Sequence, residues 1–408
     1  MRPGHLLLAI PLLACSSLRA VAFDLSQDVA VSGYADFRLI APDNQTSWLN
    51  YGLGKFRFGP NRGNARFVEG VLQVDAAVED DLHFIAVGRA EAEQRSGVDA
   101  LEAYFSWKPR SDGDLVWSVK TGIFFPTISL ENDDIGWTSP YTLTPSAINT
   151  WIGEELRTFG SEAIVKWRTD IGTFSAMGAL FCCNDPAGVL IADRGWAMDD
   201  RPSGIFERLP LPDATMHIFH APLSQRTAEF EEIDGRVGWY YGLGWQIPDV
   251  GKITVVNYNN QADDAAATSR DGGWATRFWS VGARTQLGPV TLIAQGMTGD
   301  TGIEAFPGAD FYTDFQSAFL LVSYDIDDWR LSLREDVFQT RSEANPSSPM
   351  NEDGHALTMA ASWTQYEWLR VTGEWIVMSS RKGEYVLDGM PSPNFTGNQF
   401  QLSTRFSF

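Results

Sequence analysis

The stretch Asn398–Phe408, NQFQLSTRFSF, alternates between two kinds of residue. From Phe400 onward, every second residue is apolar or small, and the residues between them can face water. The first kind comprises Phe400, Leu402, Thr404, Phe406 and Phe408, and the second comprises Gln401, Ser403, Arg405 and Ser407. A period of two over a whole segment predicts a β-strand with one apolar face and one wet face. Ending on Phe-Ser-Phe is unusual for a strand of a soluble sheet.

The same alternation recurs along the whole chain. In Val29–Leu39 the odd-numbered positions are apolar or small, whereas Tyr34, Asp36 and Arg38 fall on the other face. By the same pattern, Val68 and Leu101 are expected on the apolar, outward faces of their strands. The predicted strands are 29–39, 68–78, 82–92, 101–108, 115–123, 161–168, 171–182, 232–246, 252–261, 276–287, 290–298, 315–324, 329–340, 355–363, 368–378 and 398–408.

The connections between these segments alternate in length. Short turns are expected near 79–81, 109–114, 169–170, 248–251, 288–289, 325–328 and 364–367. Longer loops are expected at about 42–65, 124–160, 184–228, 262–275, 299–314, 341–354 and 379–397. Short turns on one side and long loops on the other are typical of outer-membrane barrels, whose turns are periplasmic. The sequence therefore predicts an all-β fold, a single transmembrane antiparallel β-barrel of about sixteen strands.

The first residues have the composition of a signal peptide. Arg2 provides a positive start, Leu6–Ala14 is an apolar run, and Ala20–Ala22 is a small-x-small cleavage site. Two domains are therefore expected, a signal peptide at 1–22 and the barrel at 23–408. The alternative is a lipoprotein cleaved before Cys15. Elsewhere no apolar run approaches the ~20 residues that a membrane helix needs.

The composition is acidic, with 31 Lys+Arg against 52 Asp+Glu and a formal net charge of −21. Without residues 1–22, which include Arg2 and Arg19, the net charge is −23. This disfavours nucleic-acid binding, which depends on basic patches. The charge suits a surface that holds divalent cations beside anionic lipid, and it suits simple solubility through charge repulsion equally well.

The predicted loop 124–160 is the third on its side of the barrel. It is too long for a hairpin and too aromatic for disorder, which indicates a functional loop. The residues that lead into it form the pattern G-x-F-x(4)-S-L-E, made of Gly122, Phe124, Ser129, Leu130 and Glu131.

With the strand pattern and the terminal Phe408, this segment resembles bacterial outer-membrane porins of about sixteen strands, and in particular the phosphate-selective porin O/P group. The match to that group spans Gly122–Glu131, and Phe125 stands where the group tends to have lysine. The resemblance implies that the third outer loop folds inward and narrows the barrel. It also implies a homotrimer, and a closing strand whose Phe408 is an assembly signal for the barrel assembly machinery.

Charged residues are expected on two sides of the lumen. The third loop offers Glu131, Asp133, Asp134, Glu154 and Glu155 as constriction residues. The lumen wall offers Arg89, Arg168, Arg236, Arg284, Arg330, Arg334 and Arg370. Rings of charge select ions in pores, and guanidinium groups stay charged and bind anionic groups. The alternative is that these are ordinary lumen charges that pair with one another.

Residues for other chemistry are scarce. Beyond residue 22 the only cysteines are the adjacent Cys182 and Cys183, which form either a vicinal disulfide or two small residues at a loop entrance. His217 and His220 would point to opposite faces of an extended segment. No G-x-S-x-G, P-loop or zinc-ligand spacing is present. We therefore predict no catalytic residue, no metal site, no cofactor and no enzymatic activity.

The predicted function is passive diffusion of small hydrophilic solutes or ions through the outer membrane of a Gram-negative bacterium. The expected partners are outer-membrane lipid and those solutes. One alternative is a substrate-specific channel for anions, sugars or organic acids, in which Tyr34, Tyr104, Tyr240 and Tyr258 form a sliding track. Two others are a non-conducting structural or adhesive barrel and an outer-membrane hydrolase.

Overall fold

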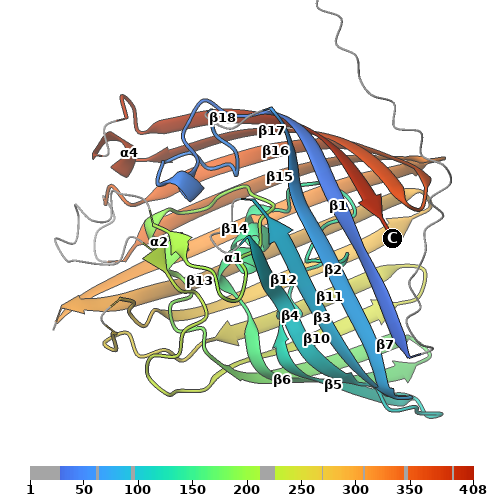
Figure 1. The fold of residues 1–408 in the computed structure, drawn as a ribbon. Coiled ribbons are helices and arrows are strands. Elements are labelled where there is room, and N and C mark those ends of the chain that lie inside the picture. Colours follow the sequence, from blue (N-terminus) through green and yellow to red (C-terminus); the bar gives the residue numbers. More distant parts are fainter. Residues whose placement is uncertain are drawn as a thin grey trace, which may run out of the picture.

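The computed structural model describes residues 28–60, 64–92, 97–211, 226–268, 270–306, 308–343, 348–387 and 390–408. They form one closed barrel of sixteen antiparallel strands (Figure 1), as predicted. The strands are β1 (Val29–Ala41), β2 (Ala65–Glu79), β3 (Leu82–Glu91), β4 (Val98–Trp107), β5 (Leu115–Phe124), β6 (Thr158–Thr169), β7 (Gly172–Cys182), β10 (Gly238–Ile247), β11 (Gly251–Asn259), β12 (Ala275–Leu287), β13 (Val290–Phe306), β14 (Ala309–Ile326), β15 (Trp329–Ser342), β16 (Glu352–Tyr366), β17 (Leu369–Lys382) and β18 (Asn394–Ser407). The expected signal peptide, and the two histidines of the longest loop, lie outside the described residues.

The closing strand β18 pairs with β1. The register runs from Tyr34 opposite Ser407 to Ala41 opposite Phe400. At the end of the chain, the backbone N–H of Phe408 donates to the carbonyl of Gly33 at 3.0 Å. This pairing leaves the barrel without a free sheet edge.

The two faces of β18 are separated as its alternation predicts. Phe400 and Phe406 are 45% and 42% exposed on the outside, whereas Gln401, Ser403 and Arg405 are at most 7% exposed on the inside. A charged group on the lipid face costs ~2–4 kcal/mol near the middle of the membrane. The polar row therefore faces the lumen, and β1 shows the same arrangement.

Two residues predicted to face outward, Val68 and Leu101, are buried and face inward, at 1% and 0% exposure. Each sits at a β-bulge, where the register shifts between β1 and β2 or between β3 and β4. An extra residue in one strand of a pair reverses the alternation of sides. The sequence pattern assumed regular strands, so both assignments were wrong.

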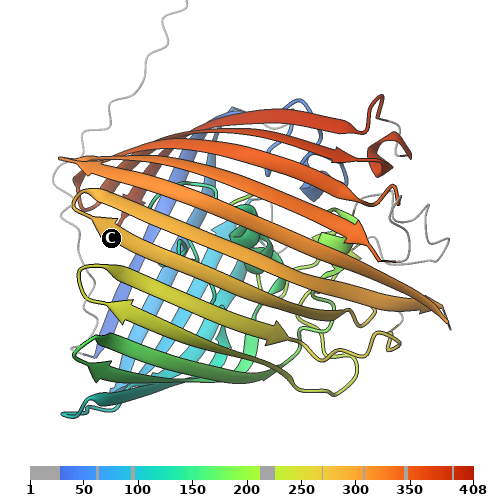
Figure 2. The same cartoon turned by 180° about the vertical axis from the view of Figure 1, so that it is seen from behind.

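Two predicted boundaries are also wrong. The strand expected at 232–246 begins only at Gly238, so residues 232–237 belong to the preceding loop. The loop expected at 299–314 is mostly strand, because β13 and β14 stay paired up to Phe306 and Ala309. Figure 2 shows this hairpin reaching beyond the neighbouring strands. Asp300 and Asp314 are cross-strand partners on the outward face of this hairpin. Here the hairpin lies beyond the membrane, so its outward residues need not be apolar and the alternation is lost.

Three outer loops fold into the barrel through their described residues: outer loop 1 (42–60 and 64), outer loop 3 (125–157) and outer loop 4 (183–211 and 226–237). Loop 1 carries η1 (Trp48–Asn50), loop 3 carries α1 (Ala147–Glu155), and loop 4 carries α2 (Val189–Asp193) with the short strands β8 (Leu209–Pro210) and β9 (Arg226–Thr227). Figure 1 shows α1 and α2 within the outline of the barrel. The short α4 (Glu384–Leu387) lies between β17 and β18. No helix in the described part of the chain combines the length and apolar character needed to cross a membrane.

The largest hydrophobic core lies in the lumen. Trp151 of α1 and Trp196 of loop 4 are 1% and 0% exposed. Their rings pack against Phe278, Phe315 and Phe338 of the wall. Aromatic side chains bury a large area, so loops 3 and 4 are folded parts of the structure that hold their polar side chains in place.

Candidate pore constriction

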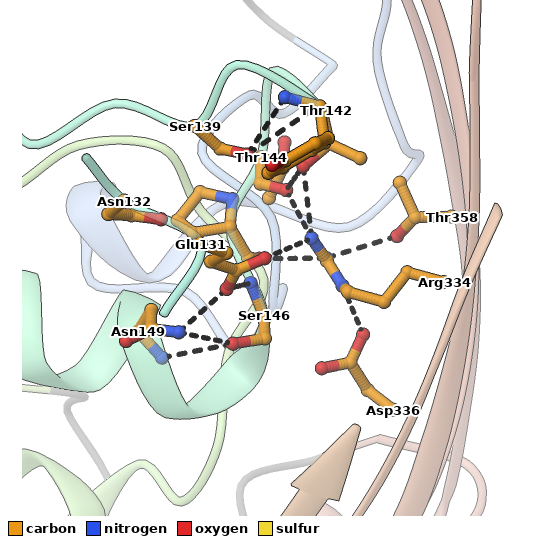
Figure 3. Close-up of polar contacts among 12 residues, drawn as sticks. Glu131, Asn132, Ser139, Thr142, Thr144, Ser146, Asn149, Arg334, Asp336 and Thr358 are labelled. Atoms are coloured by element: carbon orange, nitrogen blue, oxygen red, sulfur yellow. Dashed lines mark hydrogen bonds and ion pairs between the residues drawn. The ribbon is translucent and has the colours of Figure 1, made fainter. Parts of the chain in front are cut away.

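Loop 3 is fixed to the wall by Arg334 of β15, which is completely buried. Its guanidinium donates to the carbonyls of Thr144 and Pro145, both at 2.8 Å, and forms ion pairs with Asp336 at 2.8 Å and Glu131 at 3.4 Å (Figure 3). Further bonds reach the hydroxyls of Thr142 and Thr358. Arg334 thus joins the wall strands β15 and β16 to loop 3, at Glu131 and at residues 142–145 just before α1.

Carboxylates hold the start of α1 in the same place. Glu131 accepts from the backbone N–H of Ser146 at 2.7 Å and from the side chain of Asn149 at 2.8 Å. Asp336 accepts from the N–H of Ala147 at 3.0 Å, so a wall carboxylate faces the helix N-terminus, where negative charge is stabilising. Glu131 is 0% exposed. It therefore positions the loop and does not line an open channel.

The tip of loop 3 carries the exposed charges. Asp133 pairs with Arg284 of β12 at 2.7 Å, and Asp134 pairs with Arg370 of β17 at 3.4 Å. Their side chains keep between 30% and 55% of their surface exposed. Arg330 of β15 is also partly exposed and pairs with Asp325 at 2.6 Å. Acidic groups on the loop thus face arginines on the wall at a solvent-accessible level, and their role in a constriction stays a prediction.

Glu154 and Glu155, also predicted for the constriction, are buried and bind loop 4. Glu154 pairs with Arg194 at 2.7 Å, and Glu155 accepts from the N–H of Leu190 at 2.8 Å. Burial raises the pKa of Glu155 to about 7. The two glutamates therefore join loop 3 to loop 4 and do not face the arginines of the wall.

The remaining predicted arginines lie in three different places. Arg89 is buried on β3 and pairs with Glu91 at 3.1 Å. Arg168 lies near the periplasmic end of β6, on the lumen side and exposed. Arg236 is not on the wall, because it lies in loop 4, outside β10, where it pairs with Asp263 at 2.5 Å while 53% exposed.

The role of loop 4 was not predicted from the sequence, where residues 184–228 were expected only to form an outer loop. Asp200 pairs with Arg38 of β1 at 2.5 Å and with Arg57 of loop 1 at 3.0 Å. Arg201 pairs with Glu91 at 2.6 Å. The run Asp199–Arg201 was a visible signal, because charges in an aromatic-rich loop need partners when they are buried.

On the periplasmic side of loop 3, the predicted wall arginines Arg168 and Arg284 belong to a larger group of cations, whose three lysines were not among the predicted site residues. Its members are Lys120, Lys166, Arg168, Lys252 and Arg284. Lys252 lies opposite Arg284 on paired strands, and Lys120 is 3.8 Å from Glu162. Three of the six lysines in the chain belong to this group, which we call the basic wall. Lysines at inward positions of predicted strands were the signal that could have revealed it.

The tyrosines considered as a sliding track do not form one. Tyr240 and Tyr258 are each 1% exposed and belong to the large core that holds α1. Tyr34 belongs to a separate cluster, against which Tyr104 packs. Buried rings in two clusters offer no continuous surface to a passing sugar.

Cys182 and Cys183 are joined by a disulfide at the end of β7, which confirms the first of the two alternatives. Glu232 accepts from the N–H of Cys183 at 3.0 Å, and Asp185 accepts from the N–H of Ile233 at 2.6 Å. Burial and the nearby Glu232 raise the pKa of Asp185 to about 6. These carboxylates cap the backbone where loop 4 begins and ends.

No protein-family model matches the sequence, and no curated protein matches it. Solved structures do match. The outer membrane channel DcaP of Acinetobacter baumannii has a TM-score of 0.55 at 10% identity, covering 93% of this chain and 97% of that chain. The anion-selective porin from Comamonas acidovorans has 0.53 at 12% identity, covering 93% and 99%. In-vitro folded OmpT of Vibrio cholerae, in a trimer form, has 0.51 at 9% identity, covering 93% and 99%. Likeness at such identities concerns the fold alone, which is that of sixteen-stranded outer-membrane porins.

Proposed function

We propose that this chain is a porin in the outer membrane of a Gram-negative bacterium, through which small hydrophilic solutes diffuse passively. The observation that carries the proposal is a closed barrel with an apolar outside. Inside it, the exposed tip of loop 3 sets Asp133 and Asp134 against Arg284 and Arg370. Opposed charges at a narrowing produce a transverse field and bias the ions that enter. Such a channel needs no cofactor and no catalytic residue.

The favoured solutes are anions. The basic wall places five cations on the periplasmic side of loop 3, where Lys166, Arg168 and Lys252 are exposed. The net charge of the whole protein is negative, but charges act over only ~8 Å at physiological ionic strength. The groups that line the path therefore outweigh the carboxylates of distant outer loops.

The phosphate-selective O/P group remains a family resemblance within this proposal. Two features of its segment have a local structural role: Gly122 has a φ of +140°, and Ser129 accepts from the N–H of Asn132 at 2.9 Å. Phe125, which replaces the lysine, stacks on Trp137 at 4.2 Å between ring centroids. With an aromatic contact at this position instead of a lysine, any anion preference has to come from other residues. The contact therefore does not support a dedicated phosphate site.

We further propose that the protein assembles as a homotrimer, and that Phe408 at the end of the closing strand is an assembly signal for the barrel assembly machinery. The trimer form of a protein with the same fold supports the first part. Phe408 is 46% exposed on the outside of the barrel, where a second protein can reach it, and this supports the second part.

Reversal potentials in a salt gradient test the channel and its preference. Wild-type protein in planar bilayers should conduct and favour chloride over potassium. Lys252→Glu should shift the reversal potential toward cation preference, because it reverses a charge on the basic wall. Lys108→Glu is the matched control, since Lys108 is an exposed lysine in the turn after β4. An equal shift in both variants would contradict the assignment of the basic wall.

The filled lumen favours one other candidate, a barrel that does not conduct. Loops 1, 3 and 4 bury aromatic and charged side chains inside the cylinder. The same bilayer experiment separates the two functions. Absence of current at every voltage and pH, from protein that shows the gel shift of a folded barrel, supports the sealed barrel and contradicts the porin.

A further inference from the structure

The outer face of β15 contains a charge in the band that faces lipid. Along this strand the outward-facing residues are, in order, Trp329, Leu331, Leu333, Glu335 and Val337. Glu335 is six residues from Trp329. A tilted strand rises ~2.5 Å per residue along the membrane normal, so Glu335 sits ~15 Å into an apolar band ~25 Å tall.

Glu335 makes no hydrogen bond or ion pair within the described residues. His355, on the outer face of the neighbouring β16, also has none there, and Gln339 of β15 donates only to Gln316 of β14 at 2.7 Å. Lipid tails offer polar groups no partner, and unpaired ionisable groups inside a membrane are costly. The face around Glu335 is therefore poorly suited to lipid. The outward positions of β5, β6 and β7 carry no charged residue at all.

These residues line a hollow in the outside of the wall. The groove has a volume of about 1140 Å³ and extends from Trp279 to Asn394 across neighbouring strands. Gly296 and Ala318 lie opposite each other on β13 and β14 and form a notch without side chains. A Cβ added at Gly296 would be 3.9 Å from its nearest neighbour, an ordinary contact distance. Packing inside the protomer therefore does not require a glycine there.

We propose that the outer face of β13–β16, around Glu335 and the notch, is the contact face for a second copy of this chain. A second copy presents the same carboxylate and imidazole, so Glu335 can pair with the partner subunit's His355. Small residues let two backbones approach closely inside a membrane. The proposal rests on the homo-oligomer proposed above and adds the face through which it forms.

Two glycine substitutions provide the test, with oligomeric state measured by light scattering in mild detergent and on unheated gels. Gly296→Leu and Gly178→Leu both place leucine six residues from the periplasmic end of a strand, on its outer face. A Cβ at Gly178 has no neighbour within 4 Å. Leucine suits lipid at both sites, so both variants should fold. We expect wild type and Gly178→Leu to be oligomers and Gly296→Leu to be at least tenfold depleted in oligomer.

The outcomes that overturn the proposal differ in what they imply for the porin function. Wild-type protein that is monomeric overturns the oligomer and the face together, while its conductance still tests the channel. If the Gly296→Leu variant forms the same oligomer as wild type, only the proposal of this contact face is overturned. That conclusion holds even if a lipid or another protein covers the groove.

A second variant, Glu335→Leu, addresses the charge itself. If Glu335 faces a second copy, the variant loses a polar contact, and its oligomer should dissociate at a lower temperature than wild type. If Glu335 faces lipid, leucine suits the site better, and the dissociation temperature should not fall. The second result contradicts the proposal.

Discussion

Loops 3 and 4 both lie inside the barrel, but they are held there by different forces. Loop 3 is held by its own backbone, whose N–H and carbonyl groups bond Glu131, Asp336 and Arg334. Loop 4 is joined to β1 and β3 by ion pairs between side chains, those of Asp200 and Arg201, in addition to the packing of Trp196 and the bond from Leu190 to Glu155. A network centred on backbone groups fixes a shape. When loop 4 moves away from the wall, its ion pairs with Arg38 and Glu91 break together. We therefore infer that loop 4, and not loop 3, moves when the channel conducts.

The largest expected effect comes from removing the anchor of loop 3. Arg334→Ala leaves Glu131 and Asp336 buried without their cation, and breaking such a group costs ~3–5 kcal/mol. The strand pairs are untouched, so the loss should appear as release of loop 3, measured as protease cleavage within 125–157. Arg277→Ala is the control, because Arg277 is 64% exposed and pairs with Asp300 of β13, in an ion pair that solvent screens. Equal protection of loop 3 in wild type and Arg334→Ala would contradict this role.

A somewhat smaller effect is expected at loop 4. Asp200→Ala removes the carboxylate that joins loop 4 to Arg38 and Arg57, which keep Asp36 and Glu91 as partners. Losing buried bonds to charged groups should favour undocking of the loop by ~1–3 kcal/mol. Single-channel conductance should rise, because the loop no longer fills the outer half of the lumen. Asp263→Ala removes an exposed pair with Arg236 and should leave conductance unchanged. Unaltered conductance in Asp200→Ala, with a folded barrel, would show that loop 4 does not restrict the path.

The pH dependence of the current distinguishes the loops further. Burial, with help from Glu154 and Asp200, raises the pKa of Asp199 in loop 4 to about 8. In a released loop its pKa is ~4. The docked loop thus favours the neutral acid, and docking weakens as pH rises from ~4 to ~8, as the same linkage predicts for Glu155. Current should increase between pH 5 and 8, and Asp199→Asn should make this increase smaller. An identical pH profile in that variant contradicts the linkage.

The smallest effect on stability is expected at the exposed tip of loop 3. Asp133→Asn removes an ion pair whose two side chains are 38% and 55% exposed, and exposed pairs contribute ~0–1 kcal/mol. Its effect should instead appear as a shift of the reversal potential toward stronger anion preference, since Arg284 loses its neutralising partner. A large loss of stability without a change in selectivity would place Asp133 among the anchors of the loop.

Much of the barrel could be predicted because strand alternation is a local property. Lipid outside and water inside impose a period of two on every regular strand. Prediction failed at Val68 and Leu101, where a bulge shifts the register, and at 299–314, where the strands continue beyond the membrane. Neither departure has a local signature strong enough to be read from composition.

The candidate site was predictable in content but not in arrangement. Asp133 and Asp134 pair with wall arginines, whereas Glu154 and Glu155 join loop 4. Which carboxylate meets which cation depends on contacts between residues that are 40 to 236 positions apart. Arg236 was assigned to the wall because its strand was expected to begin at 232, six residues before Gly238.

The sequence by itself determined the architecture, since the closing stretch Asn398–Phe408 and its counterparts each specify which side faces lipid. The tertiary structure alone decided what fills the lumen. Loops 1, 3 and 4 carry no periodic pattern, and the partners of their aromatic and charged residues lie on distant strands and on one another. Burial of unpaired charge is costly, so those partners, and not the local sequence, determine where each loop lies.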